Sequence, residues 1–158
     1  MLRVKGDSYP LATINVIIFI ILLILTAFFV ISEFAIVRVR PPRIEYLASQ
    51  GNKKAKSAKR IMDDLNAYLS TTQLGITLTA LGMGWLGEPT VGHLIESAFE
   101  SIEIPAAVMR PISSIIAFLV ITYLNVVLGE LAPKTYAIQK AEKTALLIAK
   151  PLIVFHHI

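Results

Sequence analysis

Residues 11–37 read LATINVIIFIILLILTAFFVISEFAIV, and this stretch decides the fold of the 158-residue chain. Its polar residues are few and scattered: Thr13, Asn15, Thr26, Ser32 and Glu33. A run of about 18 apolar residues already marks a membrane-span candidate. A helix over this stretch is about 40 Å long, which exceeds the roughly 30 Å hydrocarbon core of a bilayer. Residues 11–37 are therefore predicted to span a membrane, and the run is too long for a cleaved signal peptide.

The composition also indicates a membrane protein. Hydrophobic residues make up 55% of the chain and charged residues 16%, against roughly 45–50% and 25% in ordinary soluble domains. There is no cysteine, which excludes disulfides, thiolate metal sites and cysteine nucleophiles. No Ser/His/Asp set is expected at one depth of the membrane, so hydrolysis is a poor fit and we do not predict an enzyme.

Two further stretches are candidates for membrane spans. Residues 67–87 contain no charge but many hydroxyl groups and glycines. Small residues recur there every fourth position, at Thr71, Gly75 and Thr79, a spacing that lets a neighbouring helix approach closely in lipid. The last stretch, residues 111–131, is apolar over most of its length. The sequence thus predicts an all-α integral membrane protein with three transmembrane helices, at about residues 11–37, 67–87 and 111–131.

Amphipathic helices are predicted beside the spans. Residues 53–66 follow a Gly51–Asn52 break and place apolar residues three and four positions apart, at Ala55, Ala58, Ile61 and Leu65. Residues 138–158 are predicted to form an interfacial helix that is broken near Pro151, and a short fourth span there stays open. We expect residues 1–158 to form a single transmembrane domain, and the apolar end of the chain indicates a piece of something longer.

The charges predict the orientation. Residues 38–64 carry eight basic and three acidic residues, whereas residues 88–110 carry four acidic residues and one basic residue: Glu88, Glu96, Glu100, Glu103 and Arg110. Basic loops stay on the cytoplasmic side of a membrane. We therefore predict a multi-pass protein of the cell (plasma or inner) membrane with its N-terminus outside and its C-terminus in the cytosol. The net charge of +4 reflects this topology and not nucleic-acid binding.

Polar residues of the three spans are expected at one depth, near the cytoplasmic side. Successive spans alternate in direction, so the inner ends carry Ser32 and Glu33, then residues 70–73, then Asn125 with Glu130. Such groups are costly against lipid, which favours an arrangement in which they face one another or a wet cavity. Hydroxyl, amide and carboxylate oxygens suit a hard cation such as Mg²⁺, Ca²⁺ or Na⁺.

The backbone is predicted to add a ligand before Pro133. Proline has no N–H, so the carbonyl four residues earlier, at Gly129, loses its helical partner. A released carbonyl at membrane depth needs compensation from protein or from a cavity. Asn125 and Glu130 are five residues apart and do not share a face of an α-helix, but unwinding or a π-bulge in this segment could turn both inward.

Three motifs in this order resemble the transmembrane domain of the CNNM/CorC family of magnesium transporters. They are Ser32-Glu33-Phe34, then STTQLG at residues 70–75, then GELAPK at residues 129–134. The resemblance covers essentially the whole chain, and the Gly-Glu-x-x-Pro-Lys pattern is the most specific of the three motifs.

The resemblance implies a homodimeric, sodium-coupled transporter that exports Mg²⁺ from the cytosol. Family members continue into cytosolic CBS domains that bind ATP, and often into a C-terminal domain; neither is present in this chain. Glu33 and Thr72 are possible participants in sodium binding. Carried over residue by residue, the metal ligands would be Ser32, Ser70, Asn125, the Gly129 carbonyl and Glu130.

A second reading of the same residues stays open. The chain could be a membrane anchor and dimerisation module for absent cytosolic regulatory domains, without ion transport of its own. In that case the polar layer only holds helices together, as serine and threonine side chains often do in membranes. The two readings differ in whether an ion stabilises the fold through Glu130.

Overall fold

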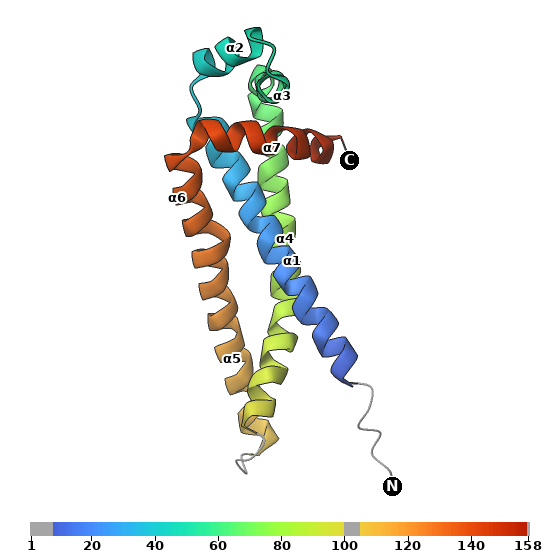
Figure 1. Ribbon diagram of the computed structural model, residues 1–158. Helices are drawn as coiled ribbons and strands as arrows, with labels where there is room; N and C mark the ends of the chain where they lie inside the picture. Colours follow the sequence, from blue (N-terminus) through green and yellow to red (C-terminus); the bar gives the residue numbers. More distant parts are fainter. Residues whose placement is uncertain (1–7, 100–104, 158) are drawn as a thin grey trace.

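The computed structural model describes residues 8–99 and 105–157 (Figure 1). Within these residues the chain is helical, with short links and without a strand, which confirms the predicted all-α class. In chain order the helices are α1 (Ser8–Arg38), α2 (Pro41–Ser49), α3 (Lys53–Asp63), α4 (Leu65–Ala98), α5 (Ala106–Leu124), the π-helix η1 (Asn125–Leu131), α6 (Ala132–Gln139) and α7 (Ala141–His156).

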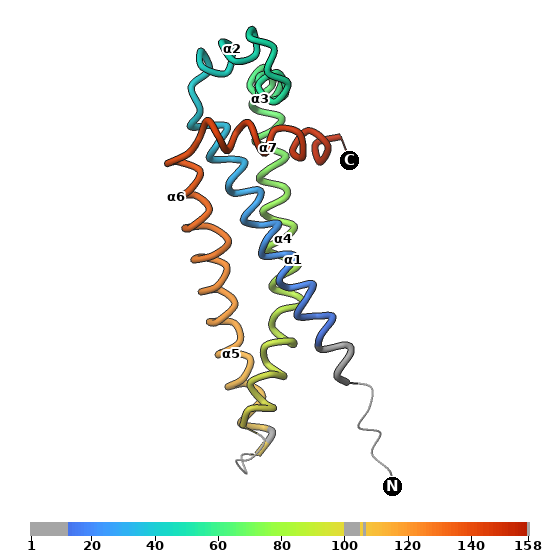
Figure 2. Tube along the Cα trace, in the orientation of Figure 1, coloured from blue at the N-terminus to red at the C-terminus, as the bar shows by residue number. Residues whose placement is uncertain are grey.

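Three long rods run side by side: α1, α4, and the uninterrupted series α5–η1–α6 (Figure 2). Helix α4 packs against both α1 and α5, and α1 also contacts η1 and α6. Among the described residues, the stretches 13–38 and 107–139 are long and apolar enough to cross a membrane. Helix α4 is of similar length but more polar, so the second predicted span, residues 67–87, stays a prediction.

The predicted second span is only part of a longer helix. Helix α4 continues to Ala98 with Pro89 inside it, so Glu88 and Glu96 of the acidic segment 88–110 lie on a helix. Proline removes a single helical bond, and the turns around it can keep their own. The other two acidic residues of the segment 88–110, Glu100 and Glu103, lie outside the described residues.

The predicted C-terminal helix, residues 138–158, needs two corrections. The helix begins at Ala141, because Lys140 leaves the helical conformation with φ −125° and ψ 40°. The predicted break near Pro151 is wrong, since α7 runs through it. Pro151 deprives only the Leu147 carbonyl of a partner, and both residues lie on the exposed face of α7, where water or lipid headgroups can replace the lost bond.

The link between α2 and α3 follows from two residues. Gly51 has φ +84°, and the N–H groups of Gly51 and Asn52 donate back to Ala48 and Leu47, the glycine-dependent ending of a helix. The Asn52 side chain then accepts from the N–H groups of Lys54 and Ala55, at 2.9 and 3.2 Å. The predicted start of a helix at residue 53 is therefore confirmed, but α3 ends at Asp63 instead of residue 66. Helix α2 has no counterpart among the predicted helices.

A hydrophobic core joins the ends of the long rods to α7. Helix α7 lies across α1, α3 and α4 (Figure 1) and does not run parallel to them as a fourth span would. Burying apolar side chains is the main force that holds such a crossing helix in place. The buried residues of this core are Ala35, Ile36, Val39, Ile44, Ala58, Ile61, Tyr68, Ala137, Ala145, Ile148, Ala149 and Leu152.

Helices α1 and α4 approach closely where small residues were predicted to allow it. A Cβ atom built on Gly75 would lie 2.6 Å from the Phe29 ring, and Phe29 is 2% exposed. One turn later, the Thr26 hydroxyl donates to the Thr79 hydroxyl (2.8 Å), which donates to the Gly75 carbonyl (2.9 Å). The four-residue spacing of Gly75 and Thr79 therefore sets the α1–α4 contact.

We expect Gly75→Ala to destabilise the fold by about 1–3 kcal/mol, because the new methyl group overpacks a buried ring that has little room to move. Gly84→Ala is the matched control on the same helix, since no atom lies within 4 Å of its built Cβ. The control should melt at the wild-type temperature or above it, as alanine favours helix over glycine by about 1 kcal/mol. Equal melting temperatures for the two variants in detergent would contradict the close approach.

Candidate functional site

The site begins with the backbone of η1. The Ala132 N–H donates to the Val127 carbonyl, five residues earlier, which is the π-helical pattern. The next donor along the chain would be residue 133, but Pro133 has no N–H. Residue 133 can therefore bond neither the Leu128 carbonyl, five residues back, nor the Gly129 carbonyl, four residues back. The predicted π-helical distortion before Pro133 is confirmed.

This segment places Asn125 directly over Gly129. A Cβ atom built on Gly129 would lie 2.6 Å from Asn125 Oδ1, 3.4 Å from the Thr26 methyl group and 3.5 Å from a Leu23 methyl group. Gly129 is buried. Any side chain at residue 129 would displace the amide oxygen, so glycine is required here for packing and not for its backbone angles.

The amide oxygen of Asn125 has no partner. Three buried side-chain polar atoms lack a hydrogen bond among the described residues: Ser113 Oγ, Asn125 Oδ1 and Thr144 Oγ1. Burying an acceptor without a donor costs roughly 1–3 kcal/mol, so such an atom in a native fold requires an explanation. At Asn125 the unpaired oxygen lies beside a glycine backbone at a distorted turn, and a hard cation would satisfy it.

The other predicted ligands are placed less closely together. Ser32 is buried on α1 and its hydroxyl donates to the Phe28 carbonyl at 2.7 Å. Ser70 is exposed on α4, and its hydroxyl donates to the Asn66 carbonyl at 3.0 Å. Glu130 is exposed, so the π-helix turns Asn125 but not Glu130 inward. Of the five predicted ligands, the structure brings Asn125 and Gly129 into contact, and the metal-binding roles of all five stay predictions.

The charged side chains near the site are not paired with one another. Within the described part of the chain, neither Glu33 nor Glu130 forms an ion pair. Lys134, four residues after Glu130, places its ammonium group 4.6 Å from the centre of the Phe34 ring, a favourable cation–π geometry. Thr72 is buried and donates to the Leu69 carbonyl at 2.8 Å. The carboxylate of Glu130 thus has no cationic side chain within 4 Å among the described residues.

Sequence reasoning missed the role of Thr26. Its position in the middle of the apolar run suggested only an interruption, yet its hydroxyl bonds α4 and its methyl group lies against the space above Gly129. The available signal was its polarity at a position deep in a span, where polar residues are costly. The same argument had been applied only to the inner ends of the spans.

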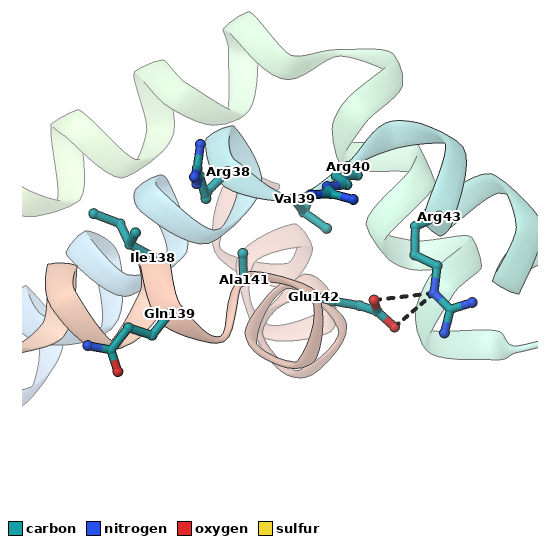
Figure 3. A pocket seen from close by; sticks show the side chains of 8 residues that line it. All are labelled: Arg38, Val39, Arg40, Arg43, Ile138, Gln139, Ala141 and Glu142. Atoms are coloured by element: carbon teal, nitrogen blue, oxygen red, sulfur yellow. Dashed lines mark hydrogen bonds and ion pairs between the residues drawn. The ribbon is translucent and has the colours of Figure 1, made fainter.

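A pocket lined by arginines lies elsewhere. Figure 3 shows Arg40 and Arg43 near the junction of α6 and α7, where the Arg43 Nε lies 3.2 Å from a carboxylate oxygen of Glu142. Both side chains of this pair are about half exposed, so the contact contributes at most about 1 kcal/mol. It helps to fix α2 against α7, and none of the predicted metal ligands lines the pocket.

The donor set suits a cation that prefers oxygen. No group of three or more His, Cys, Asp or Glu side chains is arranged to hold a metal in the described ranges 8–99 and 105–157. Soft or borderline metals such as Zn²⁺ are usually bound by imidazole or thiolate groups. The oxygens at Asn125 and Gly129 fit Mg²⁺, Ca²⁺ or Na⁺ instead, with water completing the coordination.

The comparisons identify the family. A family model described as the cyclin M (CNNM) transmembrane N-terminal domain matches residues 17–158. The chain is 51% identical over 145 residues to the UPF0053 protein YhdP of Bacillus subtilis (92% of the chain, 33% of the relative). It is 55% identical over 136 residues to YhdT of the same organism (86% of the chain, 30% of the relative).

This chain belongs to the CNNM transmembrane-domain family, which confirms the resemblance found in the sequence. It is therefore a domain of a membrane protein, in a family related to ion transport and not known as an enzyme family. The chain spans about a third of the length of the curated relatives it matches.

We expect Asn125→Leu to leave the metal-free protein as stable as the wild type or more stable. Leucine branches at the same carbon as asparagine and is similar in size, and it removes an acceptor that has no donor among the described residues. Thr26→Val is the matched control, because it deletes a hydroxyl that is bonded across helices, and it should cost about 0.5–1.5 kcal/mol. The check is melting in detergent with a chelator present, and a marked loss of stability in Asn125→Leu would show that its oxygen has a protein partner.

Proposed function

We propose that this domain moves Mg²⁺ out of the cytosol in exchange for Na⁺. The observation that carries the proposal is the buried, unpartnered Asn125 Oδ1 over Gly129, in the π-helical turn before Pro133. Membership of the CNNM family supports ion transport as the class of function. Magnesium as cargo and sodium as the coupling ion are specific parts of the proposal that come from the family resemblance.

The chemistry of binding follows from the preferences of Mg²⁺. This ion gives up its waters reluctantly and usually keeps several of them, while one or two carboxylates supply charge. In the proposed site the Asn125 amide oxygen and the Gly129 carbonyl replace some of the waters. Glu130, the next residue and free of an ion pair among the described residues, supplies the negative charge. Ser32 and Ser70 join the site when α1 and α4 shift relative to η1.

The proposal includes an orientation and partners. Residues 38–64, which include α2 and α3, carry eight of the fifteen basic residues, which supports placing this segment with α7 in the cytosol and α4 as the middle of three spans. Ions then enter from the side of α7 and leave at the far ends of α4 and α5. A homodimer in the lipid bilayer, and regulation by ATP bound to CBS domains outside this chain, complete the proposal.

The test is Mg²⁺ flux in liposomes containing the protein, driven by an imposed Na⁺ gradient. Wild type is expected to move Mg²⁺ only when the gradient is present. Glu130→Gln should lower the flux at least about tenfold, which corresponds to about 1.4 kcal/mol. It should also remove the rise in melting temperature that Mg²⁺ gives the wild type, since a ligand stabilises only the state that binds it.

Glu45→Gln is the matched control, because Glu45 is an exposed carboxylate on α2 without an ion pair in the described part of the chain. It should transport and bind like the wild type. Absence of both flux and Mg²⁺ stabilisation in the wild type would reject the transporter in favour of the anchor and dimerisation module. A Mg²⁺ response that survives in Glu130→Gln would reject the role of Glu130.

A further inference from the structure

A groove runs between α4 and α5 on the side away from α2, α3 and α7. Its inner part is a cavity of about 180 Å³ whose lining includes Gly84, Thr122 and Asn125. Its outer part is a cavity of about 360 Å³ whose lining includes Glu96 and Ser113. Glu88 lines both cavities, so the groove connects the Asn125–Gly129 site to the outer ends of α4 and α5.

The sequence of α4 explains the open space. Along one face, every fourth residue is small or acidic: Ala80, Gly84, Glu88, Gly92 and Glu96. No atom lies within 4 Å of a Cβ built on Gly84 or Gly92. The opposite face of the α4–α5 pair is closed, because Phe19 of α1 packs there against Met83 and Ile121. The groove therefore has an apolar back wall and an open, partly polar front.

Unpartnered polar atoms lie at both ends of this groove. Of the three buried polar side-chain atoms without a hydrogen bond in the described residues, two belong to residues that line it: Asn125 at the inner end and Ser113 at the outer end. Ser113 is only 1% exposed. Buried polar groups in native structures are nearly always satisfied by protein, water or an ion. Two residues with such atoms beside the groove therefore favour a filling of water or ions over lipid.

The charges of the groove favour a cation. Glu88 and Glu96 face a single basic side chain, Arg110, and neither carboxylate pairs with it within 4 Å in the described residues. His93 Nδ1 lies 3.9 Å from Glu96. Clefts lined by one sign of charge raise the local concentration of counter-ions. Glu88 lies where the two cavities meet, and Glu96 lies in the outer one. A cation that moves along the groove would pass both carboxylates.

We propose that the α4–α5 groove is the outer limb of the ion path, with Glu88 as an intermediate stopping point for hydrated Mg²⁺. This inference rests on the proposed function, in which the ion starts from Asn125 and Gly129. A single carboxylate and a shell of water suit Mg²⁺, which often binds proteins through one or two carboxylates while keeping its waters. The inner cavity has room for about six waters at about 30 Å³ each.

The first experiment tests whether the groove is wet. Because the chain has no cysteine, Thr122→Cys introduces a single thiol in the groove. Leu81→Cys is the control, because Leu81 is 66% exposed but does not line the groove. The two positions lie at a similar level along the helices: Leu81 is within a turn of Met83, and Met83 packs against Ile121, the neighbour of Thr122. A charged, membrane-impermeant thiol reagent is added from outside to the protein in vesicles. Thiols react as thiolates, which need water, so Thr122→Cys should react at least about tenfold faster.

The second experiment tests the role of Glu88 in transport. Glu88→Gln should lower Mg²⁺ flux severalfold while Mg²⁺ still raises the melting temperature as in the wild type, because the inner site is intact. Glu45→Gln should change neither quantity. Equal labelling of Thr122→Cys and Leu81→Cys, or unchanged flux in Glu88→Gln, overturns the path. Absence of Mg²⁺ flux in the wild type overturns the proposed function itself, which separates the two failures.

Discussion

The missing N–H of Pro133 is the constraint on which the site depends. The rod from Ala106 to Gln139 stays helical past this residue, although residue 133 can bond no earlier carbonyl. Just before it, over Asn125–Leu131, the bonding is π-helical, and the last of these bonds ends at Ala132. In this segment Asn125 lies over Gly129, and its amide oxygen is unpaired among the described residues. π-Helical segments are frequently found at functional sites.

The helices on the two sides of the α5–η1–α6 rod set the surroundings of Asn125 and Gly129. On one side, α1 lies against η1 and α6, and the bond between Thr26 and Thr79 ties α1 to α4 at the depth of the site. On the other side, small residues of α4 leave a groove that leads outward from Asn125. Helices α2, α3 and α7 pack with the adjoining ends of the rods in a separate apolar core. The fold thus holds this end of the bundle firmly while its middle keeps polar space.

The sequence predicted the class of fold and one feature of the site for clear physical reasons. The long apolar run, the four-residue spacing at Gly75 and Thr79, and the released backbone before Pro133 each follow from local chemistry. Other features depend on tertiary contacts. Helix α4 continues through Pro89 and α7 through Pro151 although proline favours a break, and α2 has a short and mixed sequence. Exposure of Ser70 and Glu130 also depends on how the helices pack, which periodicity alone does not fix.

The most direct test of this account is to locate a bound cation. Mn²⁺, an oxygen-preferring substitute for Mg²⁺, can be found by its anomalous scattering in crystals of the protein. The account predicts a peak between Asn125 Oδ1 and the Gly129 carbonyl, at a distance suited to direct oxygen coordination, roughly 2.0–2.2 Å, as for Mg²⁺. A crystal structure in which Asn125 Oδ1 accepts a hydrogen bond from the protein, with Mn²⁺ absent from η1, would contradict it.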